Sequence, residues 1–162
     1  MNKAISLHIE SIVAKSIICL ALIICPSISY AYDFMIEEDG IPMYFNDKGE
    51  GKAFLTYESR QLVFEDGSFG DYAEGYTGLS RLIIPSSVDY NGTTYSIVGI
   101  ESGCFQNCNF TYLSLPSSIT TINTTIASLD TLCIEDAIAW CSVTGGSKLM
   151  EKCKCTLVGS IS

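Results

Sequence analysis

Residues 79–88 (LSRLIIPSSV) and residues 110–119 (FTYLSLPSSI) are two copies of one pattern, and this pattern decides the fold. The ten positions align without a gap, and four apolar positions, the proline and both serines coincide. A third, degenerate copy (LDTLCI) occupies residues 129–134, where Glu135 follows in place of the proline. Because an internal repeat determines the whole architecture, it is the first feature to interpret.

The repeated unit Leu-x-x-Leu-x-Leu/Ile predicts a short strand with alternate side chains on one face. One unit cannot bury that face alone, so successive units stack as a solenoid. The second and third copies begin 19 residues apart, and the first and second begin 31 apart. The longer spacing contains residues 89–95, where Asn91-Gly92 predicts an inserted β-hairpin. Without about eight inserted residues the period is about 23, within the roughly 20–29 of leucine-rich repeats.

The pattern resembles the BspA-type leucine-rich repeats of bacterial surface and secreted proteins. The resemblance is carried by residues 79–88, 100–108, 110–119 and 122–134. It implies a curved repeat domain that binds proteins or mediates adhesion, without a catalytic site. Cys104 and Glu101 depart from the alanine and glycine usual at their positions, and the third copy lacks its second half. The resemblance also implies that Cys108 is a small buried thiol of the repeat.

The apolar pattern positions are the expected repeat core. They are Leu79, Leu82, Ile84, Val88, Ile100, Phe105, Cys108, Leu113, Leu115, Ile119, Ile122, Leu129, Leu132 and Ile134. The predicted fold is therefore mainly β: a short leucine-rich repeat solenoid with an N-terminal antiparallel β cap and an irregular C-terminal cap.

The domain organisation follows from where the repeat begins and ends. Residues 79–134 hold about two and a half repeats, with the hairpin insertion at 89–95. Residues 32–78 are the predicted N-terminal β cap, and residues 135–162 are the C-terminal cap or tail.

Within the N-terminal cap, runs of β-branched and aromatic residues predict strands at 41–45, 53–57 and 61–64. Polar and glycine-bearing segments at 46–49 and 58–60 are the predicted turns between them.

Residues 1–31 predict a cleavable signal peptide. Lys3 and Lys15 precede an apolar run at 17–25, and a small-residue cleavage site follows that ends at Ala31. The run is shorter than the roughly 20 residues of a membrane-spanning helix. We therefore expect a secreted or cell-surface protein with no membrane span after signal removal. A lipoprotein modified at Cys25 and a retained signal anchor are the alternatives.

Removal of this segment leaves seven Lys and Arg against seventeen Asp and Glu, and no histidine, because His8 lies within it. So acidic a chain is not expected to bind nucleic acid. Nucleophilic catalysis generally needs a base, most often histidine, so no catalytic residue and no cofactor are predicted. The cysteine spacings match no zinc template and the acidic clusters match no calcium loop, so no metal site is predicted.

Six cysteines remain after export: Cys104, Cys108, Cys133, Cys141, Cys153 and Cys155. Export permits disulfides, but the spacing does not determine their pairing. The open alternatives are free thiols at Cys104 and Cys108, a bond between those two, and a bond from Cys153 or Cys155 to Cys133 or Cys141.

The outward positions of the repeat strands are the candidate binding residues: Arg81, Ile83, Thr111, Tyr112 and Ser114. Exposed tyrosine is a typical binding anchor, and ordinary filling of a β face is the alternative. We predict a non-catalytic protein-recognition or adhesion module whose partner is an unknown protein or a host or matrix ligand, in an undetermined oligomeric state. Two alternatives remain: a truncated repeat protein with no independent function, and a carboxylate-based hydrolase.

Overall fold

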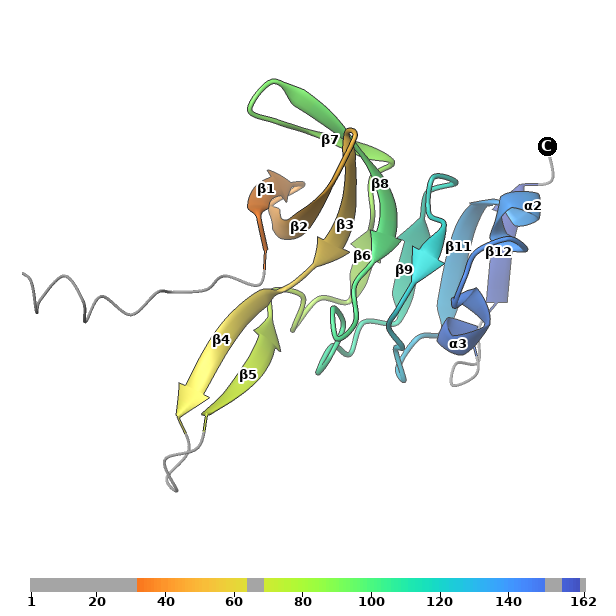
Figure 1. The fold of residues 1–162 in the computed structure, drawn as a ribbon. Coiled ribbons are helices and arrows are strands. Elements are labelled where there is room, and N and C mark those ends of the chain that lie inside the picture. Colours follow the sequence, from red (N-terminus) through yellow and green to blue (C-terminus); the bar gives the residue numbers. More distant parts are fainter. Residues whose placement is uncertain (1–31, 64–68, 151–155, 161–162) are drawn as a thin grey trace, which may run out of the picture.

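A computed structural model describes residues 32–63, 69–150 and 156–160 of the chain (Figure 1). The predicted signal peptide, residues 1–31, lies outside this part. The fold is mainly β, as the repeat predicts. Its elements are β1 (Phe34–Glu38), β2 (Ile41–Gly49), β3 (Lys52–Thr56), β4 (Glu58–Val63), β5 (Phe69–Glu74), β6 (Arg81–Ile83), β7 (Ser87–Tyr90), β8 (Thr93–Ile100), β9 (Tyr112–Leu115), β10 (Thr121–Ile122), β11 (Thr131–Asp136), α2 (Ala137–Trp140), α3 (Gly146–Met150) and β12 (Thr156–Ser160).

The N-terminal cap begins with three antiparallel strands, β1 to β3. The turn predicted at 46–49 is wrong, because β2 continues to Gly49 and the chain reverses at Glu50 and Gly51, both with positive φ. The polar segment is accommodated by an irregularity in the ladder between Asp47 and Gly49. There the Asp47 carboxylate accepts a 2.7 Å hydrogen bond from the Gly49 amide.

The β4–β5 hairpin projects from the cap (Figure 1). The turn predicted at 58–60 is wrong, since Glu58 pairs with Glu74 and the strand continues to Val63. Backbone pairing with a distant segment overrides the local turn preference of polar residues. The last residue of the strand predicted at 61–64 lies outside the described residues.

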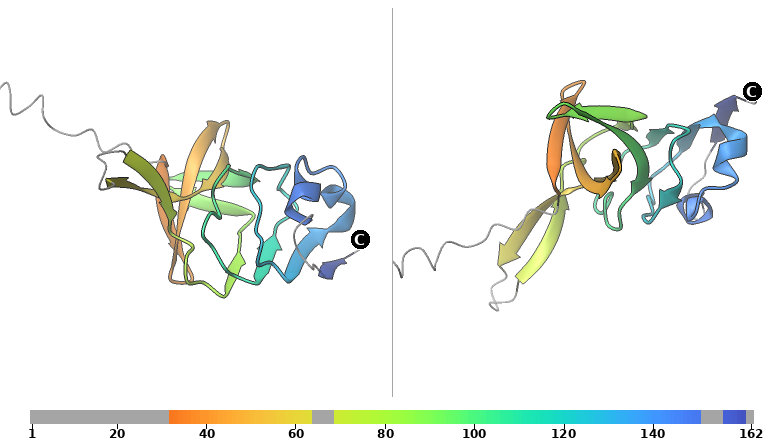
Figure 2. Two further views of the ribbon diagram at one scale, coloured as in Figure 1. Left: turned by 90° about the horizontal axis from the view of Figure 1, so that it is seen from below. Right: turned by 45° about the horizontal axis from the view of Figure 1, so that its top comes forward.

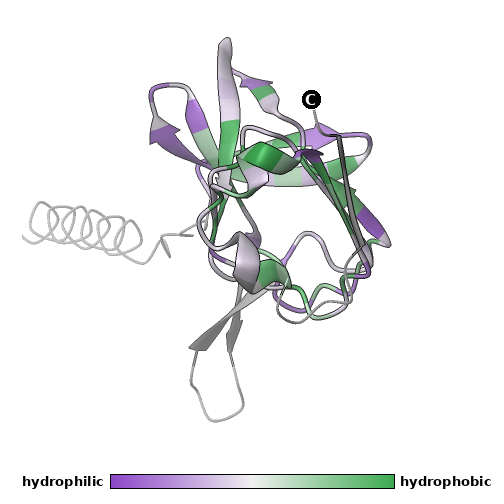
Figure 3. Ribbon diagram, turned by 90° about the vertical axis from the view of Figure 1, so that its right-hand side faces the viewer, coloured by the Kyte–Doolittle hydropathy of each residue, from purple (hydrophilic) through white to green (hydrophobic). Residues whose placement is uncertain are grey.

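The repeat strands form one parallel sheet in the order β6, β9, β11, β12. Leu82 pairs with Leu113, and Leu113 pairs with Leu132, so the three leucines occupy neighbouring rungs. All three are fully buried. The rungs follow one another from the cap to the C-terminal end (Figures 1 and 2), and Figure 3 looks along this stack. Each rung therefore covers the apolar face of the next.

A second parallel ladder forms the opposite side of the coils. It runs from β3 to β8 and β10, and Thr144 continues it through a bridge to Thr121. The Glu101 amide bonds to the Leu55 carbonyl at 2.9 Å, and the Asn123 amide bonds to the Ile100 carbonyl at 3.0 Å. The cap strand β3 thus pairs with the first coil in the same way as that coil pairs with the second.

Strands β7 and β8 form an antiparallel hairpin between the two sides of the first coil. Its turn consists of Asn91 and Gly92, with φ of 49° and 80°. Positive φ at both central residues is characteristic of a type I′ turn, whose backbone twist matches the twist of the two flanking strands. The hairpin extends β8 beyond the length of the equivalent strand β10.

Apart from Leu79 and Cys108, all the residues expected in the repeat core are buried, and these two are partly buried and pack against it. An aromatic series joins the cap to this core. Tyr76 makes edge contacts with Tyr44 and Phe105, at centroid distances of 6.2 and 5.9 Å, and Phe105 meets Phe110 at 5.3 Å. Cap and repeats therefore share one hydrophobic core.

The C-terminal segment has more regular structure than the sequence indicates. Asp136 caps α2 by accepting hydrogen bonds from the amides of Ile138 and Ala139. After α3, strand β12 pairs in parallel with β11 and adds a further rung. Cys153 and Cys155 lie outside the described residues. Among the described cysteines, Cys104, Cys108, Cys133 and Cys141 are free thiols, so the Cys104–Cys108 disulfide is not formed.

Candidate functional site

The outward side chains of β6 and β9 meet on one face of the parallel sheet. Arg81 pairs with Tyr112 and Ile83 pairs with Ser114, while the alternating Leu82 and Leu113 point into the core. Strand β11 extends this face with Thr131, beside Tyr112, and Cys133, beside Ser114. We call the set Arg81, Ile83, Tyr112, Ser114 and Cys133 the sheet face.

Arg81 and Tyr112 form a stacked pair at the centre of this face. The guanidinium carbon lies 5.2 Å from the centroid of the tyrosine ring, a cation–π contact worth roughly 0.5–1 kcal/mol at an exposed site. Within the described residues, no carboxylate lies within ion-pair distance of the guanidinium. Arg81 is exposed, so its N–H donors are available to solvent or to a ligand.

Tyr112 also interacts with the next strand. Its pKa is raised above 10.0, chiefly by a hydrogen bond with Cys133 and by electrostatic repulsion from that side chain when it is ionised, whereas the Arg81 charge and a hydrogen bond with Ser114 lower it. The phenol is therefore neutral near pH 7 and can donate or accept a hydrogen bond. Contacts on both sides hold a half-buried aromatic ring in a defined position.

A cavity of about 350 Å³ lies beside the sheet face. One wall is Arg81, Ile83 and Pro85, and the other comes from the β1–β2 hairpin. The hairpin residues are Glu38, Asp39, Ile41 and Met43. Ile83 is 45% exposed, so the cavity combines an aliphatic surface with one cation and two carboxylates. Such a mixture of apolar wall and few polar groups is typical of binding sites.

The structure brings four of the five predicted binding residues together and separates the fifth. Thr111 is exposed at the bend before β9. Its amide bonds to the Ser80 carbonyl at 3.1 Å, and its own carbonyl accepts hydrogen bonds from the amides of Asp130 and Thr131 at 2.9 Å. Its backbone thus closes the end of the sheet.

The hairpin wall of the cavity was not predicted from the sequence. Residues 38–43 are about forty positions from Arg81 in the chain, and no repeat or spacing connects them. The contact of Tyr112 with Cys133 was also missed, because the two residues are diagonal neighbours across strands. Its only signal was the third repeat copy, which aligns Cys133 with Ser114.

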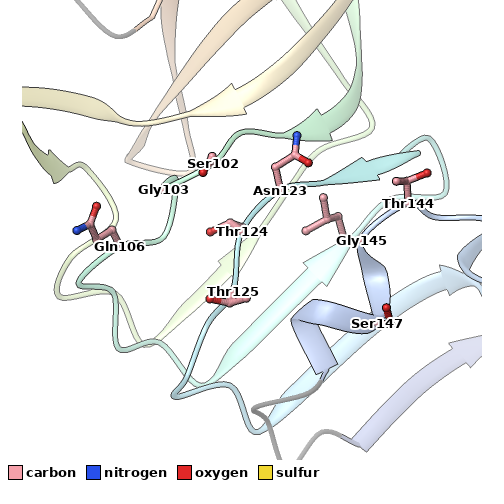
Figure 4. A pocket seen from close by; sticks show the side chains of 10 residues that line it. Ser102, Gly103, Gln106, Asn123, Thr124, Thr125, Thr144, Gly145 and Ser147 are labelled. Carbon is pink, nitrogen blue, oxygen red and sulfur yellow. The ribbon is translucent and has the colours of Figure 1, made fainter.

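A second cavity, of about 500 Å³, lies on another side of the coils (Figure 4). Three segments that follow equivalent points of successive coils form it. Its lining residues are Ser102, Gly103, Gln106, Ile122, Asn123, Thr124, Thr125, Thr144, Gly145 and Ser147. We call it the hydroxyl groove.

Within the described ranges, no group of three His, Cys, Asp or Glu side chains could hold a metal ion. No helix in the same ranges is long and apolar enough to cross a membrane. The expectations that the chain has no catalytic residue, cofactor or metal stay predictions.

No protein-family model matches the chain, and no curated protein matches it. Three solved structures are similar to it. A leucine-rich repeat protein from Bacteroides capillosus is 19% identical over 79% of this chain and 99% of its own, with a TM-score of 0.46. A leucine rich cell surface protein from Faecalibacterium prausnitzii is 12% identical over 78% of this chain and 32% of its own, with a TM-score of 0.46. A leucine-rich repeat protein from Bacteroides ovatus is 18% identical over 80% and 38%, with a TM-score of 0.40.

Proposed function

We propose that the chain is a secreted or cell-surface, non-catalytic module that recognises a protein ligand through the sheet face and the cavity beside it. The observation that carries this proposal is the Arg81–Tyr112 pair beside the exposed Ile83. Arginine and tyrosine are enriched among the residues that dominate binding energy at protein interfaces. A stacked pair on a packed sheet is already ordered, so the two side chains lose little conformational entropy when a ligand binds.

The proposed location rests on residues 1–31, whose short apolar run and small-residue site are typical of an export signal. In that location the partner is an extracellular protein, such as one of the host or its matrix. The BspA-type assignment belongs to the same proposal, since it rests on the repeat pattern of residues 79–134.

Surface plasmon resonance with immobilised extracellular-matrix proteins tests this function. The full-length chain is expected to bind at least one of them, and Tyr112→Ala should weaken that binding by roughly tenfold or more, as for a dominant interface residue. Ile83→Ala should also weaken it. Ile138→Ala is the matched control, because Ile138 is 66% exposed on α2 and belongs neither to the sheet face nor to the lining of the cavity beside it.

Two results would contradict the proposal. One is that no matrix protein binds the folded chain. The other is that Tyr112→Ala and Ile83→Ala bind as the unaltered chain does, which would exclude the sheet face.

A further inference from the structure

The hydroxyl groove has a lining unlike that of the sheet face. Every described residue that lines it is uncharged, and most carry a hydroxyl or an amide group. These groups both donate and accept hydrogen bonds. The nearby carboxylate of Glu101 pairs with the Lys48 ammonium at 2.6 Å. The groove therefore has many paired donor and acceptor positions and no net charge to attract an ion.

One hydroxyl in the groove is placed in a way that packing alone does not explain. Thr124 is only 7% exposed, yet its hydroxyl makes no hydrogen bond with a described residue. Because no fully covered side-chain oxygen lacks a partner in the described part, this hydroxyl must remain accessible from the groove. Figure 4 shows the Thr124 and Thr125 oxygens turned toward the loop that carries Gln106. A mostly buried hydroxyl without a protein partner gains stability from one supplied by a ligand or water.

The backbone makes this groove a stable feature. The Ile122 amide bonds to the Thr144 carbonyl at 2.8 Å, and the Thr144 amide bonds to the Thr120 carbonyl at 2.9 Å. A Cβ on Gly145 would lie 2.0 Å from the Ile122 carbonyl oxygen, so only glycine allows the third coil to approach this closely. The walls are thus successive coils fixed by main-chain hydrogen bonds.

We propose that the hydroxyl groove binds a neutral saccharide. Its volume of about 500 Å³ falls within the roughly 300–1,000 Å³ of small-molecule sites. Sugar hydroxyls match the donor and acceptor pairs of serine, threonine, asparagine and glutamine side chains. The Ile122 side chain and the threonine methyl groups provide apolar surface for the C–H groups of a sugar ring.

Charge selects among saccharides. The sequence has 18 Asp and Glu against 9 Lys and Arg, and no described residue of the groove is a cation. An acidic sugar would therefore lose hydration without gaining an ion pair, and the negative protein would repel it. The occupant is therefore a neutral glycan. The test must distinguish binding of neutral glycans from binding of acidic ones.

Saturation-transfer difference NMR of the full-length chain with cellotriose, maltotriose, mannotriose and chitotriose tests the proposal, followed by calorimetry on any that bind. Sialyllactose and a heparin disaccharide are the acidic probes. At least one neutral trisaccharide should bind. Thr124→Val, which keeps the side-chain shape but removes the hydroxyl, should weaken it by roughly tenfold, and Thr124→Ser should retain it.

Thr93→Val is the matched control, since Thr93 is exposed on the β7–β8 hairpin, outside the groove. It should bind as the unaltered chain does. Thr125→Trp, which fills the groove from an exposed position, should abolish binding while circular dichroism shows the native β spectrum. The proposal is overturned if no neutral trisaccharide binds, if Thr124→Val binds unchanged, or if the acidic probes bind more tightly.

Discussion

Glu135 on β11 accepts two hydrogen bonds from Ser117, which lies in the turn after β9 on the preceding coil. Its Oε2 atom is 2.9 Å from the Ser117 amide nitrogen and 3.2 Å from the Ser117 hydroxyl oxygen. The residue that replaces the repeat proline thus ties two coils together. The replacement of the repeat proline by Glu135 in the third copy therefore provides hydrogen bonds between neighbouring coils.

Glu135→Ala should lower the free energy of unfolding by about 0.5–1.5 kcal/mol, since the lost bonds are exposed and water replaces them. Glu135→Gln retains an acceptor oxygen and should lose less. Urea unfolding followed by circular dichroism measures both. Equal stability of Glu135→Ala and the unaltered chain would show that these bonds contribute nothing.

Leu113 is the central leucine of the stacked rungs, fully buried between Leu82 and Leu132. Leu113→Ala should cost about 2–5 kcal/mol, because it removes buried methyl groups and leaves a cavity that both neighbouring coils line. Ile83→Ala, at an outward position of the adjacent strand, should cost much less. Urea unfolding curves of the two variants provide the comparison, and similar midpoints would contradict a core shared between coils.

The repeat pattern predicted this stack because it specifies local periodicity, and periodicity determines which side chains face inward. It could not predict that β3 pairs with β8, since the cap contains no copy of the repeat. One signal was present: Gly99 lies inside strand β8, and an added Cβ would be 2.6 Å from the Phe54 ring. Glycine within a strand often marks such a close approach.

The candidate site was predictable in part for the same reason. Alternation along β6 and β9 places Arg81, Ile83, Tyr112 and Ser114 on one face, which a single sequence can indicate. The hairpin wall with Ile41 depends on how the cap folds against the first rung. The hydroxyl groove was not predicted either, because serine and threonine residues in loops have no distinctive spacing.

Tyr76 connects strands β2 and β3 within the cap through a buried hydroxyl. It accepts a hydrogen bond from the Tyr44 amide at 3.2 Å and donates one to the Thr56 carbonyl at 2.8 Å. Tyr76→Phe should lower the free energy of unfolding by about 1–3 kcal/mol, because the Tyr44 amide loses this acceptor in a buried place. Thermal and urea unfolding measure the loss.

Tyr95→Phe is the matched control for Tyr76→Phe. It removes a hydroxyl whose 3.2 Å hydrogen bond to Asp47 is exposed, so water can replace the bond and the change should be small. If both substitutions lower stability equally, burial of the Tyr76 hydroxyl is not the cause.

Tyr44 should make the fold sensitive to alkali. Burial raises the pKa of Tyr44 to about 12, helped by its 3.1 Å hydrogen bond to the Glu58 carboxylate and by that charge. The folded state therefore holds the phenol proton more tightly than the unfolded state. This contribution is fully present below about pH 10 and is lost as the pH rises toward about 12.

Urea midpoints measured from pH 8 to pH 12 check this dependence. Stability of the unaltered chain should fall above about pH 10, and the fall should be smaller in Tyr44→Phe. Tyr76 and Cys104, whose pKa values burial also raises, are present in both proteins, so the difference isolates Tyr44. A difference between the two proteins that does not change with pH would refute the assignment.

The thiols should react in the order of their exposure. Cys104 is 1% exposed, its sulfur lies 3.3 Å from the Thr56 carbonyl oxygen, and burial raises its pKa well above 9.0. Burial raises the pKa of Cys108 to about 11, whereas Cys141 is exposed on the surface. Since the thiolate is the reactive form, iodoacetamide at pH 8 should, among the four described cysteines, modify Cys141 first and Cys104 last.

Peptide mass spectrometry of the folded chain over time measures the order, and labelling in urea is the control. Unfolding should bring Cys104 to the rate of Cys141, because burial alone protects it. Equal labelling of the two in the folded chain would contradict the buried position of Cys104 between cap and repeats. Detection of a peptide in which Cys104 is disulfide-bonded to Cys108 would contradict the free thiols of the structure.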